Sequence, residues 1–470
     1  MSFSFGVEGL NAVLNRALVE GSILVIAGHP SSGKTVLAST ICAYNAQRGH
    51  RCVYISFLED RLRYFSRMKE LGLDMEDLEK RGLFKFFEMP LIVDSRFVSD
   101  LVGGVISRSI EEFNPKIVVF DPISPLLKVL NSDVRARSLL HNYLINLTRY
   151  FNGLTILVAE VSHDEDKVEL NEIEFIADTV LMLKNRIVKK SLINELLIMK
   201  SKYSRITTAR LIYTIEKGKG FKVYPPPVLN EIPAPKINTE TVKPCRDLIN
   251  LKISIHPGEF IHIYNPSLSS LNYVLLTAFI STVFENKRTL VISYESPPNS
   301  LWNIMKELVK GLEIGSDIHT VLDMLSDHLT MKGLNPYSYV PEQLYYKTLE
   351  LVDELKPDTV MFIGATSIGP LNSENFKDLV VNHVLTLRKL GLTVILVSHS
   401  DDFLRQLNES IADVIIYIKP LEGPKELDIK FIRKGRKPID VDSGILNRCV
   451  EEMLKTLEEQ VKNVSALRNT

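Results

Sequence analysis

The stretch Ser22–Thr35, SILVIAGHPSSGKT, decides the fold of this chain. Its first part, Ser22–Ala27, is a short apolar run rich in β-branched residues, which indicates a buried strand. The second part, Gly28–Thr35, matches the pattern G-x-x-x-x-G-K-[ST] of a phosphate-binding loop. The residues that follow, VLASTICAYNAQRGH, predict a helix that ends near Gly49. A strand, a glycine loop and a helix in this order predict an α/β domain that binds a nucleotide.

The residue types of the loop suit the binding of phosphate and of the Mg²⁺ that accompanies it. Gly28 and Gly33 let the backbone approach a ligand closely, and the N–H groups of the loop and helix N-terminus carry positive partial charge. The Lys34 ammonium suits the β- and γ-phosphates, and the Thr35 hydroxyl suits Mg²⁺. An accidental match in a glycine turn is the alternative. The expected cofactor-binding residues are Gly28, His29, Pro30, Ser31, Ser32, Gly33, Lys34, Thr35 and Val36, of which His29 and Pro30 are more often loop fillers than contacts.

Two later apolar runs end in carboxylates that such a site needs. Ile117–Ser124, IVVFDPIS, predicts a strand closed by Asp121, whose carboxylate would orient Mg²⁺ or its waters. CVYISF predicts another buried strand, with Glu59 and Asp60 at its carboxyl end, where parallel sheets bind ligands. Either carboxylate would orient or deprotonate an attacking water, or else place negative charge at the start of the next helix. The sequence leaves these two roles open.

The order of these motifs resembles the KaiC-like branch of the RecA-type ATPases across the whole first half of the chain. The matching segments are FGVEGLNAVL at 5–14, GHPSSGKT at 28–35, YISFLED at 54–60, SRMKELGLDMEDLEKRGLFKF at 66–86, IVVFDPIS at 117–124, EFIADTVLML at 174–183 and IMKSKYS at 198–204. The resemblance implies a RecA-like core with ATP and Mg²⁺ as cofactors. It also implies that ATP is bound between neighbouring subunits of a homo-oligomeric ring, usually a hexamer.

One position near the expected water site departs from the pattern of that family. Relatives carry two adjacent glutamates after the second strand, and here Leu58 occupies the first of them. That position aligns with the catalytic glutamate of the wider RecA group. The resemblance therefore predicts slow hydrolysis at best, with Lys34, Glu59 and Asp60 as the candidate catalytic residues.

Lys200 and Lys202 stand where relatives carry a Lys-x-Arg pair that reaches the γ-phosphate of a neighbouring subunit. Lysine at position 202 keeps the positive charge but lacks the forked guanidinium. We therefore count both lysines among the cofactor-binding residues. A solvated strand face is the alternative for them.

The second half of the chain repeats the first at a nearly constant spacing. VYISF at 53–57 returns as LVISY at 290–294, GLTILV at 153–158 as GLTVIL at 391–396, and IADTV at 176–180 as IADVI at 411–415. These repeats predict an α/β fold of two tandem RecA-like P-loop domains, each a mostly parallel central sheet flanked by helices. We place the domains at residues 1–228 and 245–470, the second ending in a helix, with a proline-rich linker at 229–244.

The phosphate loop does not survive in the second copy. At the matching place, residues 263–276, the chain reads IYNPSLSSLNYVLL, which contains no lysine and no glycine. The segment DTVMFIGATS at 358–367 offers Ile363 or Gly364 where the first copy has Asp121. These losses predict that the second domain does not hydrolyse Mg-ATP. The stretch at 263–276 is either a turn kept for packing or a weak phosphate site made by its serines.

The composition limits the kinds of partner and the cellular compartment that we expect for this chain. A net charge of -1 and a pI of about 6.8 give no bulk attraction to nucleic acid or anionic membranes. No apolar run is long enough to span a bilayer, and no signal peptide is evident. None of the four cysteines forms a C-x-x-C pair, which indicates neither a zinc site nor a disulfide framework and favours a reducing cytoplasm. Scarce glutamine favours a thermophile, and the resemblance suggests an archaeal source.

Two classes of function fit these features. In the first, domain 1 is a slow Mg-ATPase at subunit interfaces, and domain 2 regulates it or scaffolds the ring. In the second, the protein holds ATP without useful turnover, as an ATP-gated scaffold or signalling protein. A DNA repair or recombination ATPase fits less well, because the charge is near neutral and no added DNA-binding module is evident. Protein partners would dock through domain 2 or the C-terminal helix.

Overall fold

The computed structural model divides the chain into two compact units, Met1–Pro226 and Pro227–Thr470. The described residues are 2–89, 111–125, 134–161, 171–188, 191–225, 251, 256–264, 287–310, 318–339, 341–364, 373–398, 409–420, 427–442, 444–445, 448 and 452. The predicted linker at 229–244 and most of the predicted C-terminal helix lie outside these ranges. In the described part of the chain, no helix is both long and apolar enough to cross a membrane.

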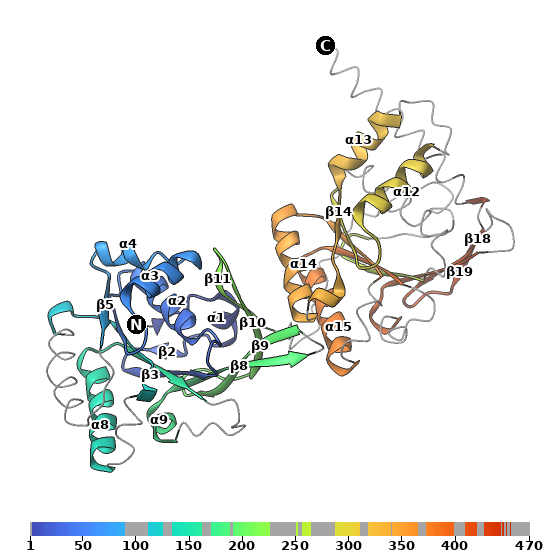
Figure 1. Ribbon diagram of the computed structural model, residues 1–470. Coiled ribbons are helices and arrows are strands. Elements are labelled where there is room, and N and C mark those ends of the chain that lie inside the picture. The colour runs from blue at the N-terminus through green and yellow to red at the C-terminus, as the bar shows by residue number, and fades with distance from the viewer. Residues whose placement is uncertain are drawn as a thin grey trace. The chain divides into compact units, whose positions relative to one another are not determined.

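The first unit is built around a nine-stranded sheet (Figure 1). Its strands are β3 (Ser22–Gly28), β4 (Cys52–Ser56), β5 (Phe84–Glu88), β6 (Ile117–Asp121), β7 (Leu154–Glu160), β8 (Thr179–Val188), β9 (Ser191–Ser201), β10 (Arg210–Glu216) and β11 (Gly220–Tyr224). Their order is β11-β10-β9-β8-β3-β7-β6-β4-β5, and neighbours from β5 to β8 pair in parallel. From β8 to β11 the pairing is antiparallel. A small separate pair joins β1 (Ser2–Phe3) to β2 (Leu18–Val19).

Helices cover both faces of this sheet, because its central strands are buried on both sides and need apolar cover. The helices are α1 (Glu8–Val13), α2 (Lys34–Ala46), α3 (Arg61–Glu70), α4 (Met75–Lys80), α8 (Val134–Tyr150) and α9 (Asn171–Ile176). One apolar core lies under α1 to α4, and a second core lies under α8 and α9 (Figure 1). The connection from β3 into α2 is the phosphate-loop segment.

The second unit has an eight-stranded sheet with the order β14-β13-β15-β16-β12-β17-β18-β19. Its strands are β12 (Phe260–Tyr264), β13 (Thr289–Ser293), β14 (Leu329–Gly333), β15 (Thr359–Ile363), β16 (Thr393–Ser398), β17 (Val414–Pro420), β18 (Leu427–Arg433) and β19 (Ile439–Asp442). The helices are α12 (Pro298–Lys310), α13 (Ile318–His328), the 3₁₀ turn η2 (Pro336–Ser338), α14 (Pro341–Leu355) and α15 (Ser373–Lys389). α12 and α13 pack on one face, and α14 and α15 pack on the other.

The two sheets have the same topology, strand for strand. In both, the first long strand lies at the centre, and the next strands are added in the same order on either side. The antiparallel strands follow on one flank, where the second sheet has one strand fewer than the first among the described residues. The prediction of two tandem RecA-like α/β domains is therefore confirmed. Figure 1 draws each sheet with its flanking helices.

Strand register decides which residue replaces Asp121 in the second unit. Ser56 of β4 is paired with Asp121 of β6, and the corresponding Ser293 of β13 is paired with Ile363 of β15. Of the two candidates that the sequence offered, Ile363 holds the position. Its side chain is buried in the apolar core of the second unit.

The structure contradicts the expectation that no disulfide forms. Cys42 and Cys52 are joined by a disulfide, with their Cα atoms 5.8 Å apart. They meet because α2 packs directly on the sheet beside β4, an adjacency that a search for C-x-x-C pairs does not detect. The cysteine pattern therefore no longer supports a reducing compartment.

A buried histidine lies in the central strand of the second unit. The side chain of His262 is fully buried on β12. Its ring packs at a tilt against that of Tyr264, with the ring centroids 4.1 Å apart, and its Nε2 lies 2.6 Å from the Ser398 Oγ. Burial lowers the pKa of His262 to about 3, and it also lowers the pKa of His383 on α15 to about 3. Both rings are therefore neutral in the folded unit at neutral pH.

These histidines predict acid sensitivity of the second unit. Below about pH 6.5 the unfolded chain takes up protons that the folded unit refuses until about pH 3, so stability falls as the pH falls. Each histidine contributes about 1.4 kcal/mol per pH unit in that window. The single tryptophan, Trp302 on α12, reports unfolding of this unit by fluorescence in urea. We expect His262→Phe to lower the pH slope by about 1.4 kcal/mol per pH unit, and an unchanged slope would contradict the assignment.

Candidate functional site

The phosphate loop is a tight turn that only glycine fits at two places. Gly33 precedes α2 in a left-handed conformation, with φ of 87°, and a Cβ there would lie 2.2 Å from the Ile215 Cδ1. A Cβ on Gly28 would lie 2.3 Å from the Leu183 carbonyl oxygen. Tyr213 on β10 donates a hydrogen bond from its hydroxyl to the Ser32 carbonyl, which ties the loop to the sheet. Pro30 and Ser31 complete the loop, and Val36 lies buried in the first turn of α2.

Lys34 places its ammonium group inside this loop. Its Nζ donates hydrogen bonds to the carbonyl oxygens of Gly28, at 3.0 Å, and of His29, at 2.7 Å. Burial lowers the pKa of Lys34, although the carboxylates of Glu160 and Asp121 oppose that shift. The Ser32 Oγ is buried without a partner among the described residues. A cation and an unsatisfied hydroxyl on one loop are the groups that a phosphate would satisfy.

Thr35 and Asp121 meet at the carboxyl edge of the sheet. The Asp121 carboxyl group accepts a hydrogen bond from the Tyr54 hydroxyl, and the Thr35 side chain lies close enough to influence it. Burial raises the pKa of Asp121, and the Tyr54 and Thr35 hydroxyl groups and the Lys34 charge oppose the rise. Within the described residues, no group of three or more His, Cys, Asp or Glu side chains could hold a metal ion alone. One hydroxyl and one carboxylate do fit Mg²⁺ when phosphates supply further ligands.

The two carboxylates after β4 have different surroundings. Asp60 is the N-cap of α3, and its Oδ1 accepts a hydrogen bond from the Arg63 N–H at 3.0 Å. The helix-start role that the sequence left open therefore belongs to Asp60. Glu59 forms an ion pair with Arg67 at 2.7 Å. Burial raises the pKa of Glu59, Arg67 lowers it, and the charge of Asp121 raises it further. Glu59 therefore lies within electrostatic reach of Asp121.

The position of the catalytic glutamate in relatives holds an exposed leucine. Leu58 follows β4 at the same edge of the sheet, and 58% of its surface is exposed. An exposed apolar side chain there neither accepts a proton nor orients a water. The Glu59 carboxylate, next to Leu58 in the chain, is held in an ion pair with Arg67.

Lys200 and Lys202 lie at the opposite edge of the sheet from the loop. The Lys200 Nζ donates to the Glu174 carbonyl oxygen at 2.7 Å, and the Lys202 Nζ pairs with the Asp178 carboxylate at 2.8 Å. Gly28 is paired with a residue well along β8, whereas Lys200 is paired with the second residue of β8. The structure therefore does not bring either lysine to the loop of its own chain.

These features have counterparts in known proteins. A family model for the KaiC ATPase matches residues 3–228. Over these residues the chain is similar to the KaiC ATPase family. The circadian clock oscillator protein KaiC of Picosynechococcus sp. is 25% identical over 221 residues, which cover 46% of this chain and 41% of that protein. The chain thus spans less than half the length of that relative.

Shorter relatives are matched over almost their whole length. A UPF0273 protein of Pyrococcus horikoshii is 23% identical over 240 residues, which cover 48% of this chain and 94% of that protein. A UPF0273 protein of Thermotoga maritima is 24% identical over 236 residues, which cover 47% of this chain and 94% of that protein. These similarities support nucleotide binding by the KaiC-like residues 3–228.

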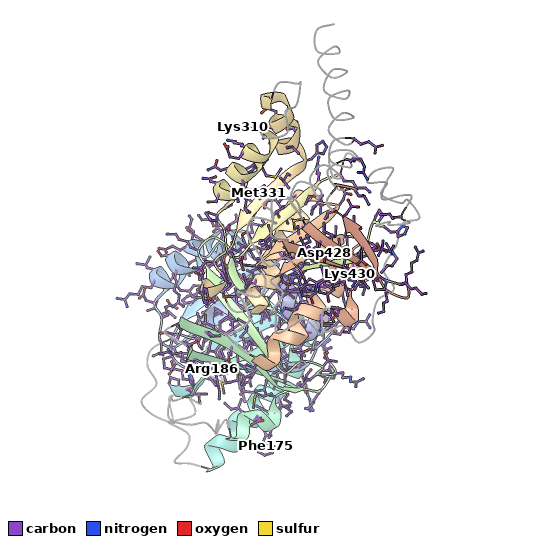
Figure 2. The ribbon with its side chains drawn as sticks, turned by 90° about the vertical axis from the view of Figure 1, so that its right-hand side faces the viewer. Phe175, Arg186, Lys310, Met331, Asp428 and Lys430 are labelled. Atoms are coloured by element: carbon purple, nitrogen blue, oxygen red, sulfur yellow. A yellow bond between two sulfur atoms is a disulfide. The ribbon has the colours of Figure 1, made fainter. Side chains whose placement is uncertain are left out.

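Exposed apolar side chains accompany the two lysines of the KaiC-like unit. Phe175 on α9 follows the residue whose carbonyl binds Lys200, and its side chain is 82% exposed (Figure 2). Met199, which precedes Lys200, is 52% exposed. Large apolar side chains that are exposed close in sequence to cations are candidates for a surface that another protein covers. Phe175 and Met199 were not predicted as site residues from the sequence. An apolar side chain next to a lysine at a strand end would have indicated Met199.

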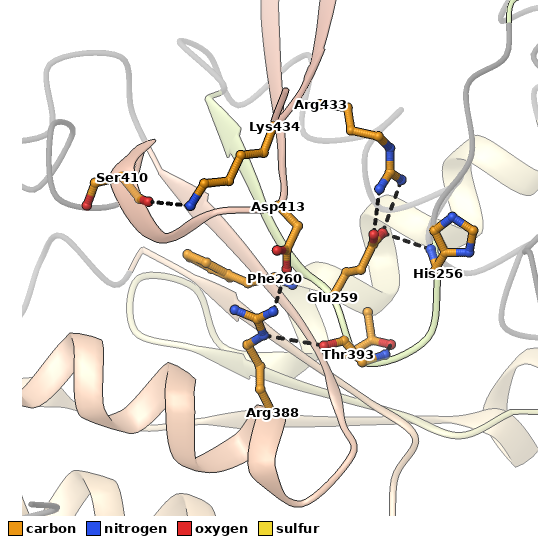
Figure 3. A network of polar contacts seen from close by, with 10 residues as sticks. His256, Glu259, Phe260, Arg388, Thr393, Ser410, Asp413, Arg433 and Lys434 are labelled. Atoms are coloured by element: carbon orange, nitrogen blue, oxygen red, sulfur yellow. Dashed lines mark hydrogen bonds and ion pairs between the residues drawn. The ribbon is translucent and has the colours of Figure 1, made fainter. Parts of the chain in front are cut away.

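The second unit closes the equivalent edge with ion pairs. Asp413 accepts a hydrogen bond from the Phe260 N–H at 2.9 Å, just as Asp178 of the first unit accepts one from a backbone N–H of β3. The charged partner of Asp413 is Arg388, at 2.8 Å. Beside it, the Glu259 carboxylate pairs with Arg433 at 2.6 Å (Figure 3). The lysine at the place of Lys202 is Lys434, whose Nζ donates to the Ser410 carbonyl oxygen at 3.1 Å. This edge is organised for stability.

The segment at 263–276, predicted to be a degenerate phosphate loop, is described only at its first two residues. β12 occupies the central position that β3 holds in the first sheet, and residues 265–276 of the predicted degenerate loop lie outside the described residues. The metal carboxylate is replaced by the buried Ile363. An apolar side chain at that place cannot ligate Mg²⁺.

Proposed function

We propose that the first unit binds Mg-ATP and hydrolyses it slowly, and that the second unit is a non-catalytic regulatory or scaffolding domain. The observation that carries this proposal is the convergence of Lys34, Thr35 and Asp121 around one glycine loop at the carboxyl edge of a parallel sheet. The similarity of residues 3–228 to the KaiC ATPase family supports the choice of ATP.

The chain's own residues divide the work of holding Mg-ATP. The Thr35 hydroxyl and the Asp121 carboxylate would hold Mg²⁺ or its waters, and the ion, when bound, neutralises charge on the β- and γ-phosphates. Lys34 would exchange the Gly28 and His29 carbonyl groups for phosphate oxygens, which relieves the burial of an ammonium bound only to neutral acceptors. The Ser32 hydroxyl would gain the partner that it lacks.

Removal of the Lys34 ammonium tests ATP binding directly. We expect Lys34→Ala to weaken ATP binding by about 10- to 100-fold, because it removes a charged hydrogen bond to phosphate. Phosphate release should fall to background in the same variant. The matched control is Lys80→Ala, which removes an exposed lysine of α4 that pairs with Glu76. Equal affinities for wild type and Lys34→Ala would exclude the phosphate-loop assignment.

The alternative function, an ATP-gated scaffold without useful turnover, is favoured by the exposed Leu58 and by the ion pair that holds Glu59. A carboxylate at position 58 would supply the missing water-orienting group. We expect Leu58→Glu to raise phosphate release by up to roughly 100-fold, the scale of general-base catalysis. Leu62→Glu, on the exposed side of α3, is the matched control for added charge. If neither wild type nor Leu58→Glu releases phosphate from ATP, the scaffold function replaces the ATPase function as the proposal.

We further propose that the site is completed by a second copy of the chain, in a ring that the family resemblance suggests is hexameric. The position of Lys200 and Lys202 away from their own loop, with exposed Phe175 and Met199 around them, supports action on a neighbour. A heterologous contact of this kind generates closed rings.

A mixing experiment tests that arrangement. Lys34→Ala and the double variant Lys200→Ala, Lys202→Ala should each be inactive alone. In an equal mixture, about one quarter of the interfaces combine an intact loop with intact lysines, so phosphate release should recover to about that fraction of wild type. No recovery in mixtures that are shown to co-assemble would place the lysines outside the site.

Several parts of this proposal rest on the sequence alone. Protein partners would bind through the second unit or the C-terminal helix. Cytoplasmic localisation and an archaeal source stay predictions. DNA repair is the least favoured activity, because the net charge of -1 offers no bulk attraction to phosphate backbones.

A further inference from the structure

A chain of three buried hydroxyl groups leads from α3 to the metal carboxylate. Tyr64 of α3 and Ser39 of α2 lie with their side-chain oxygens 2.8 Å apart. Tyr54 of β4 donates a hydrogen bond to the Asp121 Oδ2, and Ser39 lies close enough to the Tyr54 hydroxyl to oppose the rise in its pKa. All three hydroxyl residues are buried almost completely. Four elements of the first unit are thus joined through side chains that the proposed ATP chemistry does not itself require.

The carboxylate at one end fixes the direction of the bond that reaches it. An ionised Asp121 can only accept, so the single Tyr54 proton points to it. The Tyr54 oxygen is then left to accept, and Ser39 is a neighbouring hydroxyl that is able to donate to it. Ser39 and Tyr64 share a further hydrogen bond, in which either oxygen is able to act as the donor.

Aromatic packing holds the Tyr54 ring in place. The ring centroid lies 5.0 Å from that of Tyr64, 5.9 Å from that of Phe86 and 6.3 Å from that of Phe84. Tyr54 therefore has no freedom to swing its hydroxyl away from the carboxylate without disturbing a packed cluster. The Oδ2 atom that it binds is committed to a protein donor.

We propose that Tyr54 is the positioning residue of the metal site, and that it holds Asp121 in the one orientation that serves Mg²⁺ bound with ATP. Tyr54 occupies Oδ2, which leaves the other carboxylate oxygen and the Thr35 hydroxyl for Mg²⁺ or its waters. Ser39 and Tyr64 orient the Tyr54 hydroxyl and link the phosphate-loop helix to the carboxylate. This inference rests on the proposed binding of Mg-ATP by the first unit.

The test separates metal binding from nucleotide binding. A fluorescent ATP analogue is titrated onto the full-length chain, once in EDTA and once across a series of Mg²⁺ concentrations. Tyr54→Phe keeps the aromatic ring and removes only the hydroxyl. In this variant, we expect the Mg²⁺ concentration that gives half of the maximal increase in ATP-analogue affinity to rise by roughly tenfold. That factor corresponds to the loss of a hydrogen bond to a charged group. Affinity in EDTA should match that of wild type, a split that general loosening of the loop would not produce.

Two further variants keep the result interpretable. Ser39→Ala, a helix-favouring change in α2, should shift the Mg²⁺ midpoint in the same direction by a smaller factor. Tyr64→Phe, at the far end of the chain, should shift it least. An unchanged midpoint in folded Tyr54→Phe, or an equal loss of affinity in EDTA, would overturn the positioning role alone. A wild-type chain without Mg²⁺-dependent nucleotide binding would overturn both the proposed function and this inference.

Discussion

The first unit depends on keeping a carboxylate charged at a place that excludes most water. Asp121 ends a buried strand, and burial by itself raises its pKa and favours the neutral acid. Isolated burial of a charge is very unfavourable, so the groups around it must compensate. Donors from different elements do so: Thr35 from the start of α2 and Tyr54 from β4, with the Lys34 charge close by. The position of the loop, the helix and the neighbouring strand follows from that requirement.

The second unit shows what the same topology becomes when the carboxylate is absent. With Ile363 at the place of Asp121, the carboxyl edge extends the apolar core and needs no charged donors. Ionic groups instead gather at the amino edge, where Glu259 pairs with Arg433 and Asp413 pairs with Arg388 (Figure 3). Removing one member of such a buried pair leaves the other unpaired, which costs about 3–5 kcal/mol. The first unit therefore keeps a polar group at the carboxyl edge of its sheet, whereas the second unit has an apolar residue there and ion pairs at the amino edge.

The sequence predicted the features that lie in short, ordered motifs. The strand, loop and helix around Lys34, the strand ending in Asp121 and the internal repeat follow from local patterns, and the two sheets confirm the fold that they imply. Side-chain partners distant in sequence could not be found in this way. Tyr54 meets Asp121 only because β4 and β6 are neighbours in the sheet, and Cys42 meets Cys52 only because α2 packs beside β4. Which carboxylate after β4 would cap α3 also depended on where the helix begins.

The central claim is that one unit of this chain holds a nucleotide and the other does not. Its most direct test is the number of ATP molecules bound per chain at saturation with Mg²⁺, measured by equilibrium dialysis on the full-length protein. One ATP per chain in wild type, bound about 10- to 100-fold more weakly by Lys34→Ala, is the predicted result. Two ATP molecules per chain, or one that Lys34→Ala binds with wild-type affinity, would contradict the account, because the second unit would then be the nucleotide site or a second one.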